Sequence, residues 1–297
     1  MRGWLVNDRL TAIPGTRTLW HHLLDAVHGL EDRTTGQYGG LAHVTNMNAF
    51  AERPDYIIRN AAYFQRLEVE CPVIAFVQDI LQGFQRELLI DACTASRLVV
   101  FNSEYTRSAY PELHSVNYRV IPVGTDETVF APVDGLSEHA GSVLWVGSGH
   151  PVKGFDTALA LASGSKRPWV FVMKDDTSVP GHTVYRRITQ ERLAFLASVC
   201  EVGVCTSREE TQHLAGIEMG MCGLPLVATE VGVYHGRDDG AWGRVHRGDW
   251  HSEIEAVAGN DRAAVAAYWR SEGCGLDNCM SMWQSAIESL EAVHVNG

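Results

Sequence analysis

Short runs of apolar and β-branched residues alternate with longer amphipathic segments along almost the whole chain. Each run is strand-sized and is followed by polar or glycine-containing residues. Such alternation is typical of βαβ units, in which helices cover both faces of a parallel sheet. The pattern therefore predicts the α/β fold class, with strands in residues 3–6, 72–77, 97–101, 118–123, 142–146, 168–173, 201–205 and 224–229.

The segment 124–141 separates the fourth of these strands from the fifth. It carries glycine, proline and acidic residues without an apolar period, which is typical of a boundary between domains. A chain of 297 residues is also long enough for two domains of roughly 100 to 200 residues each. We therefore expect an N-terminal lobe in residues 1–132 and a C-terminal lobe in residues 133–273.

Residues 274–297 are predicted to form a C-terminal helix. Met280, Trp283, Ile287 and Leu290 recur at helical intervals, so their side chains share one helix face. This apolar face needs a surface to cover. The pattern alone allows the helix either to complete the core of the C-terminal lobe or to cross back onto the N-terminal lobe.

Composition excludes several classes of protein. Apolar residues make up 45% of the chain and charged residues 20%, which is ordinary for a globular protein. Polar residues stop the apolar run 4–6 before it reaches the length of a signal-peptide core, and no apolar run approaches the ~20 residues needed to cross a bilayer. We therefore expect a cytoplasmic protein without integral membrane association.

The net charge and the cysteines bear on nucleic-acid binding, disulfides and metal sites. The net charge of −12 opposes non-specific attraction to nucleic acid, although it leaves room for a local basic groove. The seven cysteines are an odd number and lie mostly in apolar segments, so we interpret them as reduced thiols. Cys274 and Cys279 have no second cysteine pair nearby, and no zinc site is expected there.

Two glutamates, Glu210 and Glu218, are separated by seven residues within the segment 206–229, and a Gly-Leu-Pro sequence and an apolar strand follow. Ligands of parallel α/β lobes bind outside the carboxyl ends of the strands, and strand 201–205 would deliver Glu210 to that edge. The segment resembles the E-x7-E region of GT-B glycosyltransferases of the glycosyltransferase 4 type. The resemblance implies two Rossmann-like lobes whose parallel sheets face a central cleft. It also implies that the helix in residues 274–297 crosses back onto the N-terminal lobe.

The same resemblance implies roles for this segment. Glu210 would contact the donor sugar as a catalytic residue. Glu218 would bind the ribose, because a carboxylate about two turns further along the same helix face can accept hydrogen bonds from vicinal hydroxyls. Free N–H groups at the start of the helix suit a diphosphate. Donor binding is therefore expected of Thr211, Gln212, His213 and Leu214, although His213 stands where the family usually has glycine. A solvated amphipathic helix is the alternative interpretation.

A second motif lies in residues 142–162, where a predicted strand runs into a glycine-containing loop and then a helix. Glycine lets the backbone approach a phosphate, and a lysine supplies a mobile positive charge. The loop resembles the family's VGR…KG sequence, which implies donor binding by Gly147 and Ser148 and a catalytic role for Lys153. Ser148 occupies the arginine position, so one expected charge is missing. The residues that could compensate are Lys174, Arg208 and His150, unless helix N–H groups hold the diphosphate.

The N-terminal lobe gives weaker matches. Residues 118–132 resemble the segment that ends the family's N-terminal lobe. The loop after the first strand lies where the family has a glycine loop beside the donor phosphate and the acceptor. This position implies donor binding by Gly15 and Thr16 and an acceptor contact by Arg17.

The strand 72–77 resembles the family's strand that commonly ends at a histidine in the reaction centre. In this chain Gln78 occupies that position, and Asp79 follows. We place Gln78 on the acceptor side. Asp79 is interpreted either as a catalytic residue that orients an acceptor hydroxyl or as a helix cap.

Together these matches imply a glycosyltransferase that moves a sugar from a nucleotide-diphosphate sugar to an acceptor hydroxyl with retention of anomeric configuration. No cofactor other than this co-substrate and no metal are expected, because GT-B enzymes generally need none. The acidic pairs at 175–176 and 238–239 lack a convincing metal-binding pattern and are interpreted as loop acids.

At 297 residues the chain is a short example, similar to glycosyltransferases encoded by bacteriophages. This similarity implies the cytosol of a bacterium or of a phage-infected host. It also makes a modified DNA base or a virion protein a conceivable acceptor, beside small metabolites and lipid precursors.

Three other functions remain open on the same fold. The enzymatic alternatives are a nucleotide-sugar epimerase and a phosphorylase. The third is a catalytically inactive module that binds a sugar nucleotide, to which the departures at Ser148 and Gln78 lend support. Transfer of the sugar to an acceptor would separate all three from the predicted transferase.

Overall fold

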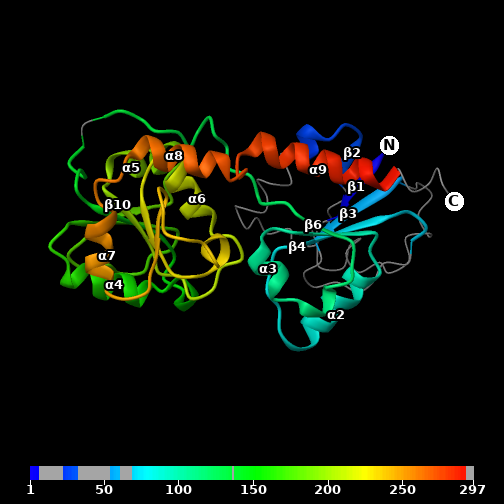
Figure 1. Cartoon of the computed structure of the whole chain (residues 1–297), viewed down its shortest axis with the longest axis horizontal. Coiled ribbons are helices and arrows are strands. Elements are labelled where there is room, and N and C mark those ends of the chain that lie inside the picture. The colour runs from blue at the N-terminus through cyan, green and yellow to red at the C-terminus, as the bar shows by residue number, and fades with distance from the viewer. Residues whose placement is uncertain (7–22, 33–53, 61–68, 136, 292–297) are drawn as a thin grey trace. The chain divides into compact units, whose positions relative to one another are not determined.

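The structure is a computed structural model that describes residues 1–6, 23–32, 54–60, 69–135 and 137–291. These residues form two compact units (Figure 1). The first unit comprises Met1–Gly124 together with Asp277–Gly297, and the second comprises Thr125–Leu276. The division falls somewhat before residue 132, because Phe130 already packs into the core of the second unit.

The first unit contains a six-stranded sheet in the order β2-β1-β3-β4-β5-β6, with every described pairing parallel. Strands β4 and β5 are almost wholly buried, as expected for central strands covered on both faces. The elements are β1 (Gly3–Val6), β2 (Leu30–Asp32), β3 (Tyr56–Asn60), β4 (Val73–Val77), α2 (Gly83–Thr94), β5 (Leu98–Phe101), α3 (Glu104–Ser108), η3 (Pro111–Leu113) and β6 (Tyr118–Val120).

The second unit contains another six-stranded parallel sheet, in the order β12-β11-β10-β7-β8-β9. Its strands are β7 (Val143–Gly147), β8 (Trp169–Met173), β9 (Thr183–Arg186), β10 (Val202–Cys205), β11 (Leu226–Ala228) and β12 (Gly243–Val245). Its helices are η4 (Pro151–Lys153), α4 (Phe155–Gly164), α5 (Gln190–Val199), α6 (Leu214–Met221), η5 (Gly232–Tyr234), α7 (Trp250–Val257) and α8 (Arg262–Ser271).

Helices cover both faces of the second sheet. Side chains of α4 and α7 pack with Trp145, Trp169 and Phe171 on one face. Side chains of α5, α6 and α8 form a separate core on the other face, which includes Trp242 and Trp269. The parallel strands and the two helical layers confirm the predicted α/β fold class.

Among the residues that the structure describes, the sequence pattern did not predict four strands: β2, β3, β9 and β12. β2 and β12 are only three residues long and lie at sheet edges, where short strands give little periodic signal. β9 is also an edge strand, and its residues are exposed or only partly buried. β3 is a buried inner strand whose apolar stretch is limited to Tyr56–Ile58, because a buried arginine, Arg59, follows.

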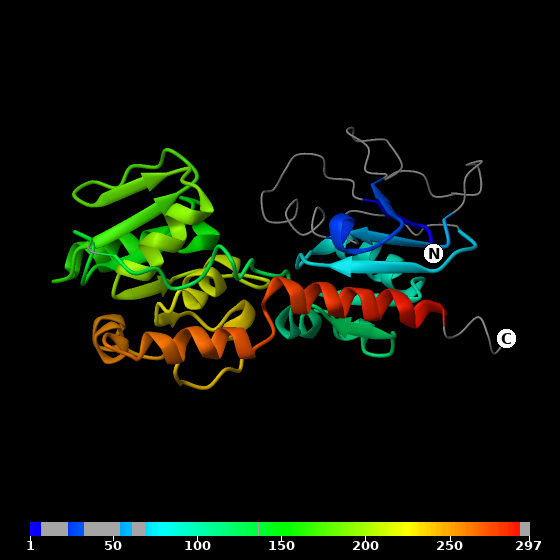
Figure 2. The same cartoon turned by 90° about the horizontal axis from the view of Figure 1, so that it is seen from above.

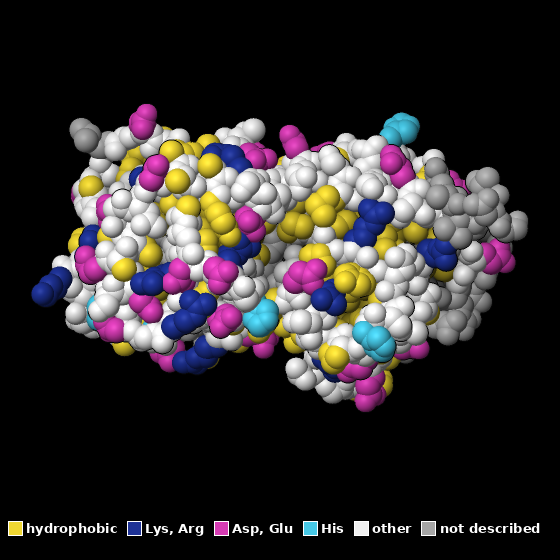
Figure 3. Space-filling view, viewed as in Figure 1, with side chains coloured by type: hydrophobic (Ala, Val, Ile, Leu, Met, Phe, Trp, Pro, Cys, Tyr) yellow, Lys and Arg dark blue, Asp and Glu magenta, His cyan; other side chains and the backbone are white. Residues whose placement is uncertain are grey.

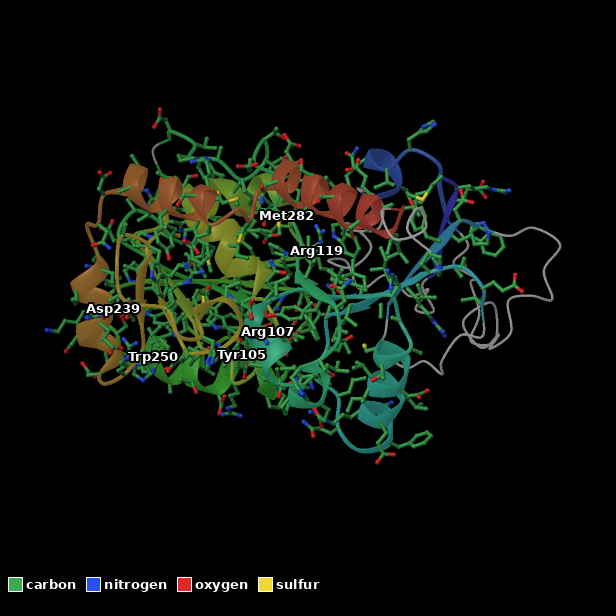
Figure 4. All side chains as sticks on the ribbon, turned by 45° about the vertical axis from the view of Figure 1, so that its right-hand side comes forward. Tyr105, Arg107, Arg119, Asp239, Trp250 and Met282 are labelled. Carbon is green, nitrogen blue, oxygen red and sulfur yellow. The ribbon has the colours of Figure 1, made fainter. Side chains whose placement is uncertain are left out.

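The C-terminal helix α9 (Leu276–Glu291) belongs to the first unit from Asp277 onward. It runs alongside the strands of that unit in both ribbon views (Figures 1 and 2). The buried Trp283 ring meets the Phe76 ring edge-on at a centroid distance of 5.3 Å. Arg119 on β6, labelled in Figure 4, donates a hydrogen bond to Ser285 Oγ at 3.0 Å. The first unit is therefore built from both ends of the chain.

Candidate active site

The loops after β7, β8, β10 and β11 all leave the second sheet at its carboxyl edge, because these strands are parallel neighbours. Gly147 at the end of β7 pairs with Met173 at the end of β8. Ser148 and Lys174 therefore leave the sheet on adjacent strands. Ligands of open α/β sheets bind at this edge, so a binding site is expected here.

Lys153 is held by a tight connection between two of these loops. Gly154 has a left-handed φ of +63°, and a Cβ at this position would collide with the carbonyl oxygen of Thr206. The Thr206 hydroxyl donates to the carbonyl oxygens of Lys153 at 3.0 Å and Gly154 at 2.9 Å, and accepts from Trp145 Nε1 at 2.9 Å. Glycine is needed here because both the backbone angle and the close approach exclude a side chain.

Lys153 Nζ donates to Glu210 Oε1 at 2.5 Å, and Ser207 Oγ donates to the same oxygen at 2.8 Å. The Glu210 side chain is 11% exposed and that of Lys153 is 35% exposed. Burial alone would raise the pKa of Glu210, but the attraction of His213 and Lys153 and the two hydrogen bonds outweigh it and lower that pKa. Glu210 is therefore an oriented carboxylate at neutral pH.

His213 also lies close to Glu210, with Nε2 3.9 Å from the same oxygen, Oε1. Its Nδ1 shares a 2.9 Å hydrogen bond with the buried Tyr234 hydroxyl, which also contacts Cys205 Sγ at 3.3 Å. Burial lowers the pKa of His213, while the carboxylate of Glu210 opposes that change. His213 caps α6 with a φ of +71°, a strained angle for a residue with a side chain. The strain marks a position that the surrounding contacts hold in place.

Glu218 lies on α6, one residue after the buried Ile217 and partly open to solvent. Its carboxylate forms no hydrogen bond or ion pair with any described residue. Burial raises the pKa of Glu218 to about 7, and the charge of Lys174 opposes that rise. A half-buried acid without a protein partner is available to a ligand.

The structure brings several predicted residues of the second unit together. Lys153, Glu210 and His213 are in contact. The remaining predicted residues of the second unit lie at the same sheet edge or on α6 and in the turn before it: Gly147, Ser148, Thr211, Gln212, Leu214 and Glu218.

The predicted residues of the first unit have a different outcome. Gln78 and Asp79 follow β4 directly and are partly buried, and Asp79 accepts a hydrogen bond from Tyr110 through its carbonyl oxygen. Gly15, Thr16 and Arg17 lie outside the described residues.

Sequence reasoning did not single out Tyr234, Thr206 or Gly216 as parts of this site. Gly216 lets α6 approach Tyr234, because a Cβ there would collide with the Tyr234 hydroxyl and with His213 Nδ1. Tyr234 lies in η5 after a different strand and carries no local motif. Its contact with His213 is formed by the buried hydroxyl and can be recognised only from the folded structure.

Carboxylates that might suggest a metal instead fasten their own loops. Asp175 accepts from the backbone of Gly149 at 2.8 Å and Thr177 at 3.1 Å. Asp239, labelled in Figure 4, accepts from Val245 N at 3.1 Å. The described residues contain no group of His, Cys, Asp and Glu side chains arranged to hold a metal. On the face drawn in Figure 3, acidic and basic side chains are interspersed and form no basic face. No helix in the described part has the length and hydropathy of a membrane span.

No family model and no curated protein matches the chain. Solved structures do. Sucrose-phosphate synthase from Thermosynechococcus elongatus superimposes with a TM-score of 0.72 at 15% identity, over 99% of this chain and 100% of that one. Anabaena Alr3699/HepE in complex with UDP-glucose superimposes with a TM-score of 0.70 at 14% identity, over 97% and 100%. The fold is GT-B.

The GT-B fold also occurs outside proteins named as transferases. The N-terminal domain of trehalose-6-phosphate phosphatase from Candida albicans superimposes with a TM-score of 0.64 at 10% identity, over 97% of both chains. Fold and function are therefore separate questions, and the function has to be argued from the GT-B site itself.

Proposed function

We propose that this protein is a glycosyltransferase that moves a sugar from a nucleotide-diphosphate sugar to an acceptor hydroxyl. The observation that carries the proposal is the grouping of Lys153, Glu210 and the start of α6 at one sheet edge, with the unpartnered Glu218 further along the same helix. A cation, free helix N–H groups and two acids suit the diphosphate, the sugar and the ribose of one donor.

Each group has a separate task in the proposed reaction. Glu218 accepts hydrogen bonds from the ribose hydroxyls, and Glu210, oriented by Ser207 and Lys153, accepts from hydroxyls of the sugar. The bond between the anomeric carbon and the diphosphate breaks as the acceptor oxygen attacks that carbon. Lys153 and the N–H groups of α6 stabilise the negative charge that develops on the leaving diphosphate.

We further propose that transfer proceeds with retention of anomeric configuration and without a metal. The leaving diphosphate takes the acceptor proton, so no enzyme nucleophile is needed. The proton couplings of the product's anomeric centre, measured by NMR, test retention. Activity that persists in EDTA tests metal independence.

The printed names of the structural neighbours guide the choice of donor. HepE was solved with UDP-glucose, and another neighbour is named a sucrose-phosphate synthase. UDP-sugars are therefore the first donors to try, followed by GDP-, ADP- and dTDP-sugars. The acceptor is a hydroxyl compound whose class the described residues do not specify.

A catalytically inactive module that binds a sugar nucleotide is the second candidate. Ser148 favours it, because a hydroxyl stands where the family motif carries an arginine charge. The GT-B domain of the Candida phosphatase shows that the fold occurs in a protein named for another activity.

Release of UDP from UDP-glucose, measured with pooled hydroxyl acceptors, tests the proposed function. Lys153→Met, which removes the charge at the diphosphate, and Glu210→Gln, which removes the carboxylate at the sugar, should each lower turnover by about 100-fold, since single stabilising groups contribute on this scale. Lys166→Met is the control, because Lys166 is exposed and precedes β8 at the opposite end of the sheet. Binding without turnover on any acceptor would support the inactive module instead.

A further inference from the structure

We propose that Lys174 supplies the second positive charge for the donor diphosphate. The inference rests on the proposed function, because it concerns the same donor site. Lys153, the other lysine at this edge, is already paired with Glu210 at 2.5 Å. One acid therefore balances that charge before a ligand arrives, and a diphosphate would bring about two further negative charges.

The register of the sheet places Lys174 beside the loop that begins at Ser148. Gly147 pairs with Met173, and both strands end there. Lys174 is exposed, whereas the residue before it is buried in the core. The lysine therefore leaves the sheet at the carboxyl edge, next to a position that carries only a hydroxyl.

Other basic side chains near this edge are engaged. Arg208 pairs with Asp156 at 2.6 Å. Arg186 donates to the carbonyl oxygens of Asp175 at 2.6 Å and Thr177 at 2.8 Å, which fixes the loop that follows Lys174. His150 caps its own short helix by accepting from Val152 N at 3.3 Å.

Lys174 differs from all of them. It forms no hydrogen bond or ion pair within the part of the chain that the structure describes. Its charge nevertheless reaches Glu218, because it opposes the rise in the pKa of that carboxyl. The ammonium group of Lys174 therefore has no protein partner among the described residues and lies within electrostatic range of Glu218. Glu218 would bind the ribose, which is joined to the diphosphate.

The identity of the residue has a chemical consequence. An arginine can bind two phosphate oxygens through its planar fork, whereas a lysine acts as a mobile point charge. We therefore expect this site to select nucleotides by phosphate charge, with UDP preferred over UMP and UMP over uridine. Nucleotide binding should also weaken as salt concentration rises.

Calorimetric titration of UDP and UMP, with uridine followed by ligand-observed NMR, tests the assignment in the full chain. Lys174→Ala should weaken UDP about tenfold, weaken UMP less and change uridine least, since the main loss is the attraction between the ammonium group and the phosphates. Lys166→Ala, an exposed lysine at the other end of the same strand, should bind all three like the wild type. An unchanged UDP affinity in Lys174→Ala, or an equal loss for all three ligands, would overturn the assignment.

A rescue variant separates charge from structural damage. Ser148→Arg added to Lys174→Ala should recover most of the UDP affinity, because the neighbouring strand end then supplies the charge. Failure of the rescue, in a double variant whose melting temperature matches the wild type, counts against a charge role for Lys174. If the wild type binds no nucleotide at all, the proposed function fails, and that outcome is distinct from a failure of Lys174 alone.

Discussion

Glu218 is a half-buried carboxyl group that no described residue neutralises. Its raised pKa of about 7 means that the ligand-free site holds a proton at slightly acidic pH. A ribose that donates two hydrogen bonds favours the ionised form, so ligand binding should lower this pKa. Binding and proton release are then coupled at this residue.

The affinity for UDP-glucose should therefore rise about tenfold between pH 6 and pH 8, because below the free pKa each binding event must first release a proton. UDP-glucose is the ligand of choice, since its diphosphate diester does not titrate in this range. Calorimetry in buffers of different ionisation enthalpy measures the released proton directly. Glu218→Gln should abolish both effects, and a pH-independent affinity in the wild type would refute the coupling.

At this scale the sequence was informative where chemistry follows a local motif. Lys153 and Glu210 were predicted from two separate motifs, and the structure places them 2.5 Å apart. Tyr234 was not predictable, because its contact with His213 depends on two loops packing over Gly216. No spacing rule in the sequence encodes such a packing contact.

The short helix η4 and the glycine after it position Lys153. Gly154 fits against Thr206 where no side chain could, and its positive φ adds a second restriction. A side chain at position 154 would therefore be disfavoured twice, by the left-handed backbone angle and by the collision with Thr206.

Gly154→Ala should lose about 2–4 kcal/mol of unfolding free energy, from the left-handed backbone and the collision together. Gly259→Ala is the matched control, because Gly259 has a φ of +84° with no atom near the added Cβ. It should lose only about 1 kcal/mol, the cost of the backbone angle. Chemical denaturation measures both, and equal losses would show that contact with Thr206 is unimportant.

Strands were predictable where an uninterrupted run of apolar residues marked them in the sequence. Strands such as β4 and β8, apolar and fully or nearly fully buried, gave clear apolar runs. The edge strands β9 and β12 contain polar residues and no apolar run. They form because they pair with β8 and β11. Tertiary pairing is invisible to a local pattern.

The whole molecule consists of one continuous unit and one that both ends of the chain complete. Trp283 on α9 and Trp269 on α8 are fully buried, the first against Phe76 and the second in the core around Trp242. The two tryptophans allow each unit to be weakened separately.

Trp283→Ala should destabilise the first unit by about 3–5 kcal/mol through the cavity it leaves. Hydrogen exchange followed by mass spectrometry should then show faster exchange in β4 and β5, with β7 and β10 unchanged. Trp269→Ala is the reciprocal variant and should give the opposite pattern. Equal acceleration in both sheets after either change would mean that the units do not unfold separately.

We propose that the second unit holds a nucleotide-sugar site built around α6. Calorimetric titration of UDP-, GDP-, ADP- and dTDP-sugars at pH 8 tests it most directly, with Glu218→Ala beside the wild type. Glu201→Ala, at the opposite end of β10, serves as control. We expect binding of one nucleotide class, weakened at least about tenfold in Glu218→Ala and unchanged in Glu201→Ala. Absence of binding in the wild type, or equal binding by Glu218→Ala, would contradict it.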